Sequence, residues 1–341
     1  MNFASDNWAG ATPAVLEALV RANAGGPAAA YGGDDVTARV HRTFCDIFER
    51  EVEIHLMGTG TATNIVSMAA CARPAGFVLC SECAHVMTDE FNGTEAATGM
   101  KLSPVGAPDG RITPATFESA LKRLPHASHR GPLVAFSMTN STEYGTVYSP
   151  ADTSALAAIA HSHGMVVHLD GARFANAVAA SGASPADLTW RAGVDLMGFG
   201  GTKNGCLAAE AIVVFEPGRF PDIANLRQRM GHGMSKTRFV AAQYEGYFAD
   251  GGWLASAAHA NAMAARLAAG ISRSTQARLP FTGAANELFP IVSKATAARL
   301  KAAGAVFHFW QEAGPDDEMI RLVTSLGTTE AEVDRFLAVL G

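Results

Sequence analysis

The chain has 341 residues, of which 48% are apolar and 17% are charged, so it can bury a large core and is too apolar for a disordered chain. Its formal net charge of −6 supplies no basic surface, which argues against nucleic acid as a partner. No run of about 18 apolar residues is present, so we expect no membrane partner either.

The cysteines and the first residues indicate a compartment. Five cysteines form an odd, scattered set that is typical of a reducing environment. The single CxxC at 80–83 has no second pair, and the histidines show no ligand spacing, so no metal site is predicted. The opening MNFASDNWAG lacks the positive region and apolar core of a signal peptide. We therefore expect a cytoplasmic protein.

From residue 53 onward, short apolar runs alternate with helical stretches. Helices are predicted at 61–72, after a glycine turn, and at 150–164, which Gly164 ends. Near-continuous apolar strands between helices predict an α/β fold with a mainly parallel sheet that helices cover on both faces. The predicted strands are 53–57, 76–80, 131–138, 165–170, 194–199 and 211–215.

The last part of the chain repeats this alternation on a smaller scale. After a helical, connecting region at 217–260, it predicts a smaller C-terminal α+β domain. Its expected helices are 257–269, 291–303 and 329–340, and its expected strands are 305–310 and 318–324. We predict an N-terminal arm at 1–12, a large domain at 13–245 and a small domain at 246–341.

Ligands of open α/β sheets bind beyond the carboxyl ends of the strands, which selects the polar residues to weigh. Residues 58–61 end one strand and open a helix, where free N–H groups and the helix dipole attract an anion. A simple turn capped by threonine explains them equally well. Asp170 ends another strand, where it either serves a ligand or caps the next helix, and Arg173 follows it.

The stretch GFGGTKNG at 198–205 runs a strand into glycines and one lysine, Lys203. A phosphate-binding P-loop needs Gly-Lys-Ser/Thr in that order, so that interpretation fails. An anion site, the carboxylate of Asp170 and a lysine at strand ends of one sheet match what pyridoxal 5′-phosphate (PLP) requires for its phosphate, pyridine nitrogen and aldehyde. We expect the glycines to let the backbone approach this cofactor.

HLDGARFANA at 168–177, with YGGDDV at 31–36, GTGTATN at 58–64, CAHV at 83–86 and GTKNG at 201–205, resembles the low-specificity L-threonine aldolases. The likeness covers most of the chain, from SDN at residue 5 to RLVTS at 321–325. It implies a large PLP-binding domain with a mainly parallel seven-stranded sheet. It also implies dimers or tetramers with shared active sites.

The resemblance assigns roles to individual residues. Lys203 forms the Schiff base, Asp170 binds the pyridine nitrogen, and His85 stacks on the cofactor ring. The segments around Gly60, Thr61, Asn64 and Thr202 complete the cofactor site. Ser5, Arg173 and Arg321 meet the substrate carboxylate, with Arg173 also beside the cofactor, while Arg229 reaches the phosphate of a neighbouring subunit.

Two departures from the family pattern concern the substrate. Thr37 stands where a tyrosine is common, and Tyr31 is expected to compensate at the substrate. Glu143 stands where many members have histidine, which leaves Glu143, His85 or a water molecule as candidate base. These changes favour a subgroup that acts on β-hydroxy-α-amino acids with bulkier, aryl side chains.

The resemblance implies cleavage of an L-3-hydroxy-α-amino acid, such as threonine, allo-threonine or phenylserine, to glycine and an aldehyde. A β-eliminating lyase or an amino-acid racemase uses the same lysine, aspartate and phosphate site, so both remain alternatives. A non-catalytic PLP-binding sensor is a third alternative, which the absence of any DNA-binding or partner module disfavours.

Overall fold

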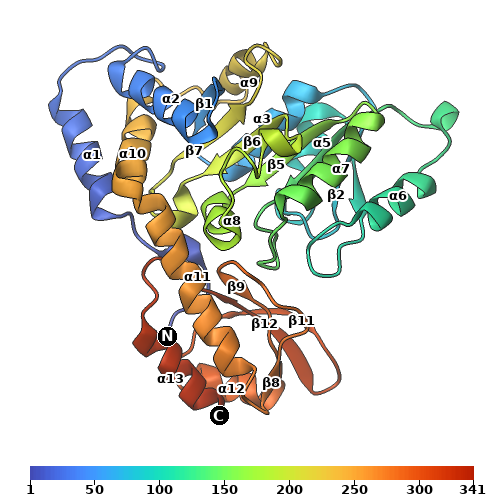
Figure 1. The fold of residues 1–341 in the computed structure, drawn as a ribbon, viewed down its shortest axis with the longest axis vertical. Helices are drawn as coiled ribbons and strands as arrows, with labels where there is room; N and C mark the ends of the chain where they lie inside the picture. The colour runs from blue at the N-terminus through green and yellow to red at the C-terminus, as the bar shows by residue number, and fades with distance from the viewer.

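Seven strands form one sheet in the computed structural model, which describes residues 1–341 (Figure 1). All neighbouring strands are parallel except β7, which runs antiparallel to both β1 and β6. The mainly parallel seven-stranded sheet is therefore confirmed. In spatial order its strands are β1 (Glu53–Met57), β7 (Glu210–Val214), β6 (Leu196–Gly200), β5 (Val166–Gly171), β4 (Leu133–Thr139), β2 (Phe77–Ser81) and β3 (Lys101–Val105).

Helices cover both faces of this sheet, as the apolar strands predict. One face packs against α3 (Gly60–Cys71), α4 (His85–Thr88), α5 (Gly93–Thr98) and α9 (Ile223–Arg229). The opposite face holds the largest core cluster and carries α1 (Pro13–Ala24), α2 (Asp35–Phe48), α6 (Pro114–Arg123), α7 (Pro150–Ser162), α8 (Phe174–Ser181) and α10 (Arg238–Phe248).

Each of the six predicted strands is present within two residues of its expected bounds. The edge strand β3 was not predicted, because only Leu102 and Val105 are buried in it and Pro104 interrupts its pattern. Helix α7 ends at Ser162, and Gly164 follows it with a φ of 71°, the left-handed conformation that glycine adopts without strain.

The smaller C-terminal lobe is an antiparallel sheet with helices against it, at the bottom of Figure 1. Its strands are β8 (Ala277–Arg278), β9 (Glu287–Leu288), β10 (Ile291–Ser293), β11 (His308–Glu312) and β12 (Asp317–Val323), and its helices are α12 (Lys294–Ala302) and α13 (Glu330–Leu340). The helix predicted at 291–303 is wrong at its start. Ile291–Ser293 is a strand, and the Ser293 side chain caps α12 by accepting from the Thr296 N–H.

Helix α11 (Gly252–Ile271) runs from the large domain into this lobe (Figure 1). Its first half packs against α8, and its second half enters the core of the small domain. The expected boundary between residues 245 and 246 falls inside α10, which packs against α1 and α2. The start of the N-terminal arm packs against the small domain, since Phe3 is fully buried in the core of that domain.

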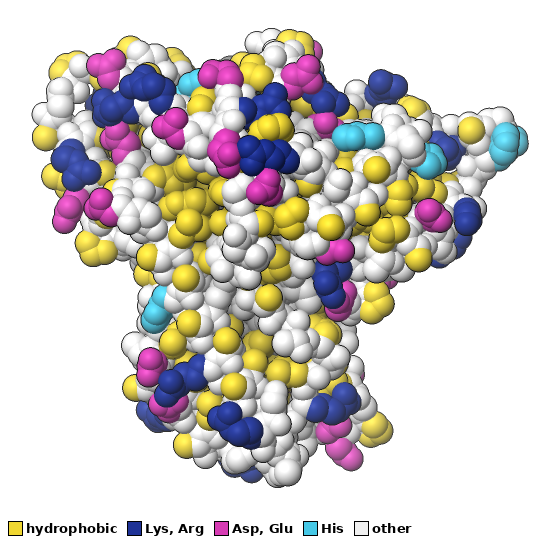
Figure 2. All heavy atoms as spheres, viewed as in Figure 1, with side chains coloured by type: hydrophobic (Ala, Val, Ile, Leu, Met, Phe, Trp, Pro, Cys, Tyr) yellow, Lys and Arg dark blue, Asp and Glu magenta, His cyan; other side chains and the backbone are white.

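Short 3-10 helices complete the fold at η1 (Asp6–Trp8), η2 (Ala127–His129), η3 (Trp190–Ala192), η4 (Thr202–Asn204) and η5 (Ala249–Gly251). None of the helices combines the length and the apolar character needed to cross a membrane. On the face shown in Figure 2, side chains of both charges are interspersed. What matters for function is that β1, β5 and β6 end at one edge of the sheet, where η1 and η4 also lie against each other.

Candidate active site

Three adjoining cavities form a cleft at this edge of the sheet. Their volumes are about 60, 370 and 220 Å³, and all three are lined by His85 and Lys203. The smallest holds the residues predicted to touch the cofactor ring, the second opens onto the start of α3, and the third reaches the small domain. Most of the predicted site residues line this cleft: Ser5, Gly60, Thr61, Asn64, His85, Glu143, Asp170, Arg173, Thr202, Lys203 and Arg321.

A chain of hydrogen bonds links Asp170 to His85 on the floor of the cleft. The Asn64 amide nitrogen donates to Asp170 Oδ2 at 2.9 Å and to Glu90 Oε1 at 2.8 Å. His85 Nδ1 lies 2.8 Å from the same Glu90 oxygen. The Ala172 N–H donates to Asp170 Oδ1 at 3.0 Å. These contacts fix the orientation of both the carboxylate and the imidazole.

The charge states of Asp170 and Lys203 follow from their surroundings. Burial alone would raise the pKa of Asp170, but the hydrogen bonds from Asn64 and Ala172 and the charge of Lys203 lower it below its ordinary value. Burial lowers the pKa of Lys203, and the nearby Arg173 charge adds to this. The cleft therefore holds an ionised carboxylate beside an amine that gives up its proton more readily than an ordinary lysine.

The start of α3 faces the second cavity. The Thr59 side chain caps the helix by accepting from the Ala62 N–H, so Gly60 and Thr61 supply the free backbone donors. Asn64 was expected in this phosphate-side group, but both amide protons are committed to Glu90 and Asp170. Its place one turn into the helix turns the side chain towards the sheet instead, where it positions Asp170.

The glycines around Lys203 are also required by packing within the chain. A Cβ atom on Gly198 would lie 2.7 Å from Thr63 Oγ1, and one on Gly200 would lie 2.7 Å from the Ala172 carbonyl oxygen. A Cβ on Gly201 would lie 2.9 Å from the Ala209 carbonyl oxygen. These contacts are with neighbouring segments of the chain itself. The glycines thus allow tight internal packing that brings the lysine to the cleft.

Glu143 lies at the junction of the first and third cavities. Its Oε1 accepts from the His85 N–H at 2.9 Å and from Thr139 Oγ1 at 2.8 Å, while its buried Oε2 has no partner. Burial, followed by the charge of Asp170, raises the pKa of Glu143 to about 7. This side chain can therefore both hold the His85 segment and exchange a proton near neutral pH.

The third cavity holds the predicted carboxylate-binding residues. Arg173 donates from Nε and Nη2 to Asp6 at 2.6 and 3.0 Å, and Arg321 donates from Nε and Nη2 to Glu287 Oε1 at 3.0 and 2.7 Å. Ser5 lines the same cavity, and its Oγ accepts from the Asn7 N–H. Both arginines are thus already paired with acids.

Two predicted residues lie outside the cleft of this chain. Tyr31 is 59% exposed with a φ of 56°, and Arg229 is exposed at the end of α9. Neither lines any of the three cavities. Thr37, which replaces the family tyrosine, bonds through its N–H and its hydroxyl to Asp34, the cap of α2.

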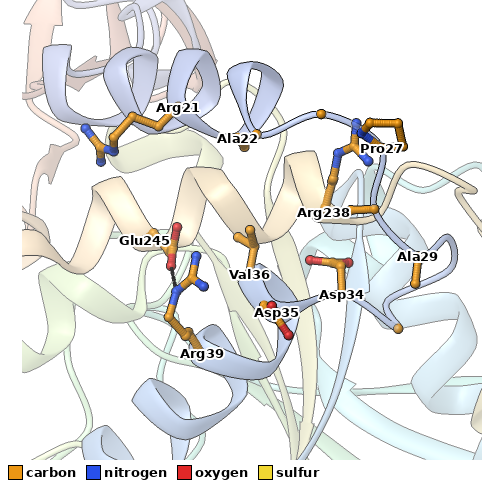
Figure 3. A pocket seen from close by; sticks show the side chains of 14 residues that line it. Arg21, Ala22, Pro27, Ala29, Asp34, Asp35, Val36, Arg39, Arg238 and Glu245 are labelled. Carbon is orange, nitrogen blue, oxygen red and sulfur yellow. Dashed lines mark hydrogen bonds and ion pairs between the residues drawn. The ribbon is translucent and has the colours of Figure 1, made fainter.

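A larger cavity of about 510 Å³ shares no lining residue with the cleft (Figure 3). It opens between α1, α2 and α10, and its charged lining balances, with three arginines and three acids: Arg21, Arg39, Arg238, Asp34, Asp35 and Glu245. The buried groups with shifted pKa values, Asp170, Lys203 and Glu143, line the three adjoining cavities instead, which makes these cavities the candidate site.

One group of potential metal ligands exists, although the sequence suggested none. His41, Cys45 and Glu51 place one ligand atom each within 4.8 Å of one another. His41 Nε2 lies 2.7 Å from the Val52 carbonyl oxygen, which commits that nitrogen as a hydrogen-bond donor. A nitrogen that carries a proton cannot ligate a metal, so the group is a hydrogen-bonded cluster.

Several acids were missed from the sequence. Asp6, Glu90 and Glu287 contact the predicted arginines or His85 and are each at most 4% exposed, while Glu210 and Asp89 line the second and third cavities. Asp6 stands inside the SDN motif, which was a usable signal. Glu90 follows His85 by five residues, and Glu287 lies in a segment, ANELFP, with no motif. Only the fold brings these carboxylates to the arginines and the histidine.

A lysine, an ionised aspartate and a helix start at the carboxyl edge of a parallel sheet define the class: a PLP-binding α/β enzyme. The profile described as Beta-eliminating lyase matches residues 2–292. This chain is similar to two low-specificity L-threonine aldolases. The one from a Pseudomonas species is 37% identical over 98% of this chain and 96% of the relative, and the one from Pseudomonas aeruginosa is 38% identical over 90% and 88%. The solved structure of Leishmania major threonine aldolase covers 99% of this chain and 98% of its own, at 30% identity and a TM-score of 0.93.

The chain belongs to the beta-eliminating lyase family and, within it, groups with the low-specificity L-threonine aldolases. The cofactor of this family is PLP. The residues of the cleft fit it: Asp170 stays ionised, the Lys203 amine has a lowered pKa, and α3 offers free N–H groups at Gly60 and Thr61.

Proposed function

We propose that this chain is an aldehyde-lyase that cleaves L-3-hydroxy-α-amino acids, such as threonine, allo-threonine and phenylserine, to glycine and an aldehyde. The observation that carries the proposal is the smallest cavity, which Asp170, Lys203 and Glu143 line together. The relatives that share most of this chain are named low-specificity L-threonine aldolases, which supports the choice of substrate class.

PLP, when bound, supplies an aldehyde that captures amino groups and a pyridine ring that accepts the electrons of a breaking bond. Asp170 would hold a proton on the pyridine nitrogen, because its carboxylate remains ionised beside Asn64. Gly60 and Thr61 would bind the phosphate through their free N–H groups, and Thr202 lines the same cavity. Lys203, which lines both cavities, would be the nucleophilic amine.

Arg173 and Arg321 would bind the substrate carboxylate, with Ser5 at the same cavity. A carboxylate held from one side fixes which bond at Cα stands perpendicular to the cofactor ring. This choice decides the reaction, since the cofactor alone does not select among bond cleavages. The His85 ring, whose Nδ1 is held by Glu90, would stack on the cofactor and prevent it from shifting.

Glu143 is the proposed base that removes the proton of the β-hydroxyl group. Its free Oε2 and a pKa of about 7 suit a group that must accept a proton near neutral pH. In the competing assignment, Glu143 only positions the His85 segment through Oε1, and His85 or a water molecule accepts the proton.

The test is a panel of threonine, allo-threonine and phenylserine with the purified PLP-loaded protein. Glycine and an aldehyde in equal amounts are expected from at least one of them. The family description favours β-elimination as the second candidate, which would release a keto acid and ammonia instead. A D-amino acid as the only product would indicate a racemase.

We propose further that two or four copies assemble and that Arg229 of one copy reaches the phosphate of another, with Tyr31 at the substrate. Trp8, Tyr31, Phe91 and Leu207 are large apolar side chains, each more than half exposed, and Leu207 lines the second cavity. Light scattering gives the assembly. Mixed oligomers of Lys203→Ala and Arg229→Ala chains should regain activity if the sites are shared.

A further inference from the structure

Glu287 is a buried acid of the third cavity for which the proposed reaction has no use. It begins β9, where it pairs with Val323 on β12, two residues from Arg321 in that strand. Its side chain is fully buried yet lines the cavity with both arginines. Oε1 accepts both donors of Arg321, while Oε2 lies 3.1 Å from Arg173 Nη1 without a hydrogen bond of good geometry.

Asp6 is the acid to compare with it. Both Asp6 oxygens accept from Arg173, and Asn286 donates to Oδ2 at 3.0 Å, so this carboxylate is a fixed support on the outer edge of the guanidinium. Glu287 instead spans the two arginines, with one oxygen towards each. It therefore lies where a ligand carboxylate would bridge the same two cations.

The charges of this cluster already balance before a substrate binds. Two guanidinium groups face two carboxylates, and the most exposed of the four side chains, that of Arg321, is only 19% exposed. A third carboxylate would give these two guanidinium groups three negative partners in a mostly buried cluster, where like charges interact more strongly than in water. A substrate carboxylate must therefore take over at least the contact that Glu287 makes with Arg173.

We propose that Glu287 is a built-in competitor for the substrate carboxylate, which weakens the binding of amino acids through their carboxylate and speeds the loss of glycine. The inference rests on the proposed role of Arg173 and Arg321. It makes Glu287 a specificity-determining residue, because its effect falls on the part of the ligand that carries the carboxylate and not on the amine.

The experiment is an equilibrium titration of the PLP-loaded protein with glycine, followed by the change in visible absorbance, so that turnover is not needed. Glycinamide, with the same amine and no carboxylate, is titrated in parallel. In Glu287→Gln the dissociation constant of glycine should fall by at least about tenfold, which corresponds to roughly one lost charge contact. That of glycinamide should stay within about twofold, since its neutral end feels no ionic competition.

Glu287→Ala is the second variant and should also lower the dissociation constant of glycine. Glu312→Gln is the matched control, because it removes one negative charge from an exposed pair with Lys294 on the same domain. Glycine affinity that is unchanged or weaker in both folded Glu287 variants would overturn the inference and leave Glu287 as a brace for the arginines.

Arg321→Gln tests separately whether the arginines bind the substrate carboxylate at all. If that variant binds glycine as tightly as the unaltered protein, the arginines do not hold the carboxylate, and the inference falls with that contact. If no hydroxy amino acid yields an aldehyde, the proposed reaction is wrong, but the glycine titration still decides the role of Glu287.

Discussion

The cleft has two sides that are built in different ways. The cofactor side takes Asn64 from α3, Asp170 from the end of β5 and Lys203 from η4, which directly follows β6. The carboxylate side takes Asp6, Arg173, Glu287 and Arg321 from four separate segments: η1, the start of α8, β9 and β12.

This difference separates the type of reaction from the choice of substrate. The groups proposed to determine reactivity are fixed within the large domain, whose strands hold them in register. The groups proposed to bind the substrate carboxylate lie between the arm, the large domain and the small domain. Changes on the first side should abolish chemistry or cofactor binding, and changes on the second should alter affinity.

The largest effect is expected for Lys203→Ala, which removes the amine of the cofactor side. The variant should lose both the visible absorption band of the bound cofactor and all measurable turnover. Absorbance and aldehyde release are the measurements, with Lys122→Ala on the exposed face of α6 as the control. A borohydride-reducible adduct at another lysine of the variant would refute the assignment.

Glu143→Gln should reduce aldehyde release by ~10²–10⁴-fold, the usual contribution of a general base. Because the pKa of Glu143 is about 7, the unaltered enzyme should lose activity as the pH falls through about 7, where this carboxylate becomes protonated. The variant should lack this acidic limb. His85→Asn is the comparison: if it loses both rate and limb while Glu143→Gln keeps them, the base is His85.

The same carboxyl group has a consequence for stability that needs no catalysis. Folding raises the pKa of Glu143 from its ordinary value of 4.5 to about 7, so the folded protein binds this proton more tightly than the unfolded chain does. The group's favourable contribution is complete below about pH 4.5 and is lost as the pH rises through about 7. The melting temperature of Glu143→Gln, compared with that of the unaltered protein at the same pH, should therefore rise between about pH 5 and pH 8. Scanning calorimetry of both proteins over this pH range measures the difference.

Asp170→Asn should keep part of its cofactor but lose roughly 10²–10³-fold in turnover, the scale of removing one preorganised electrostatic contact. A neutral amide cannot hold a proton on the pyridine nitrogen. The substitution also exchanges one of the two carboxylate oxygens, of which Oδ2 accepts from the Asn64 amide, for an NH₂ group. Turnover is measured on variant shown to be folded and loaded. Rates near those of the unaltered enzyme would contradict the role of Asp170.

The sequence predicts the two sides of the cleft unequally well, for physical reasons. Asp170 and Lys203 follow apolar strands, so the rule on strand ends places them together without a structure. Asp6 and Glu287 depend on how the arm and the small domain meet the sheet, which no local pattern encodes. Asn64 shows the limit within the sheet, since its motif was clear but the direction of its side chain was not.

The smallest effect is expected for Arg321→Lys on the carboxylate side. Lysine keeps the charge but lacks the planar fork, so it cannot bind Glu287 and a substrate carboxylate as Arg321 does. KM should rise by about tenfold, the cost of roughly one weakened contact, while kcat changes little. The absorption band should persist, because the cofactor side is untouched.

Arg299→Lys on α12 is the matched control, since Arg299 donates only to the Leu340 carbonyl oxygen at 3.0 Å, remote from the cleft. Steady-state kinetics with the best substrate of the panel give the two parameters separately. If Arg321→Lys instead lowers kcat and leaves KM unchanged, Arg321 acts during bond breaking. The two sides of the cleft would then not divide reactivity from affinity, because a residue of the small domain would contribute to the chemical step.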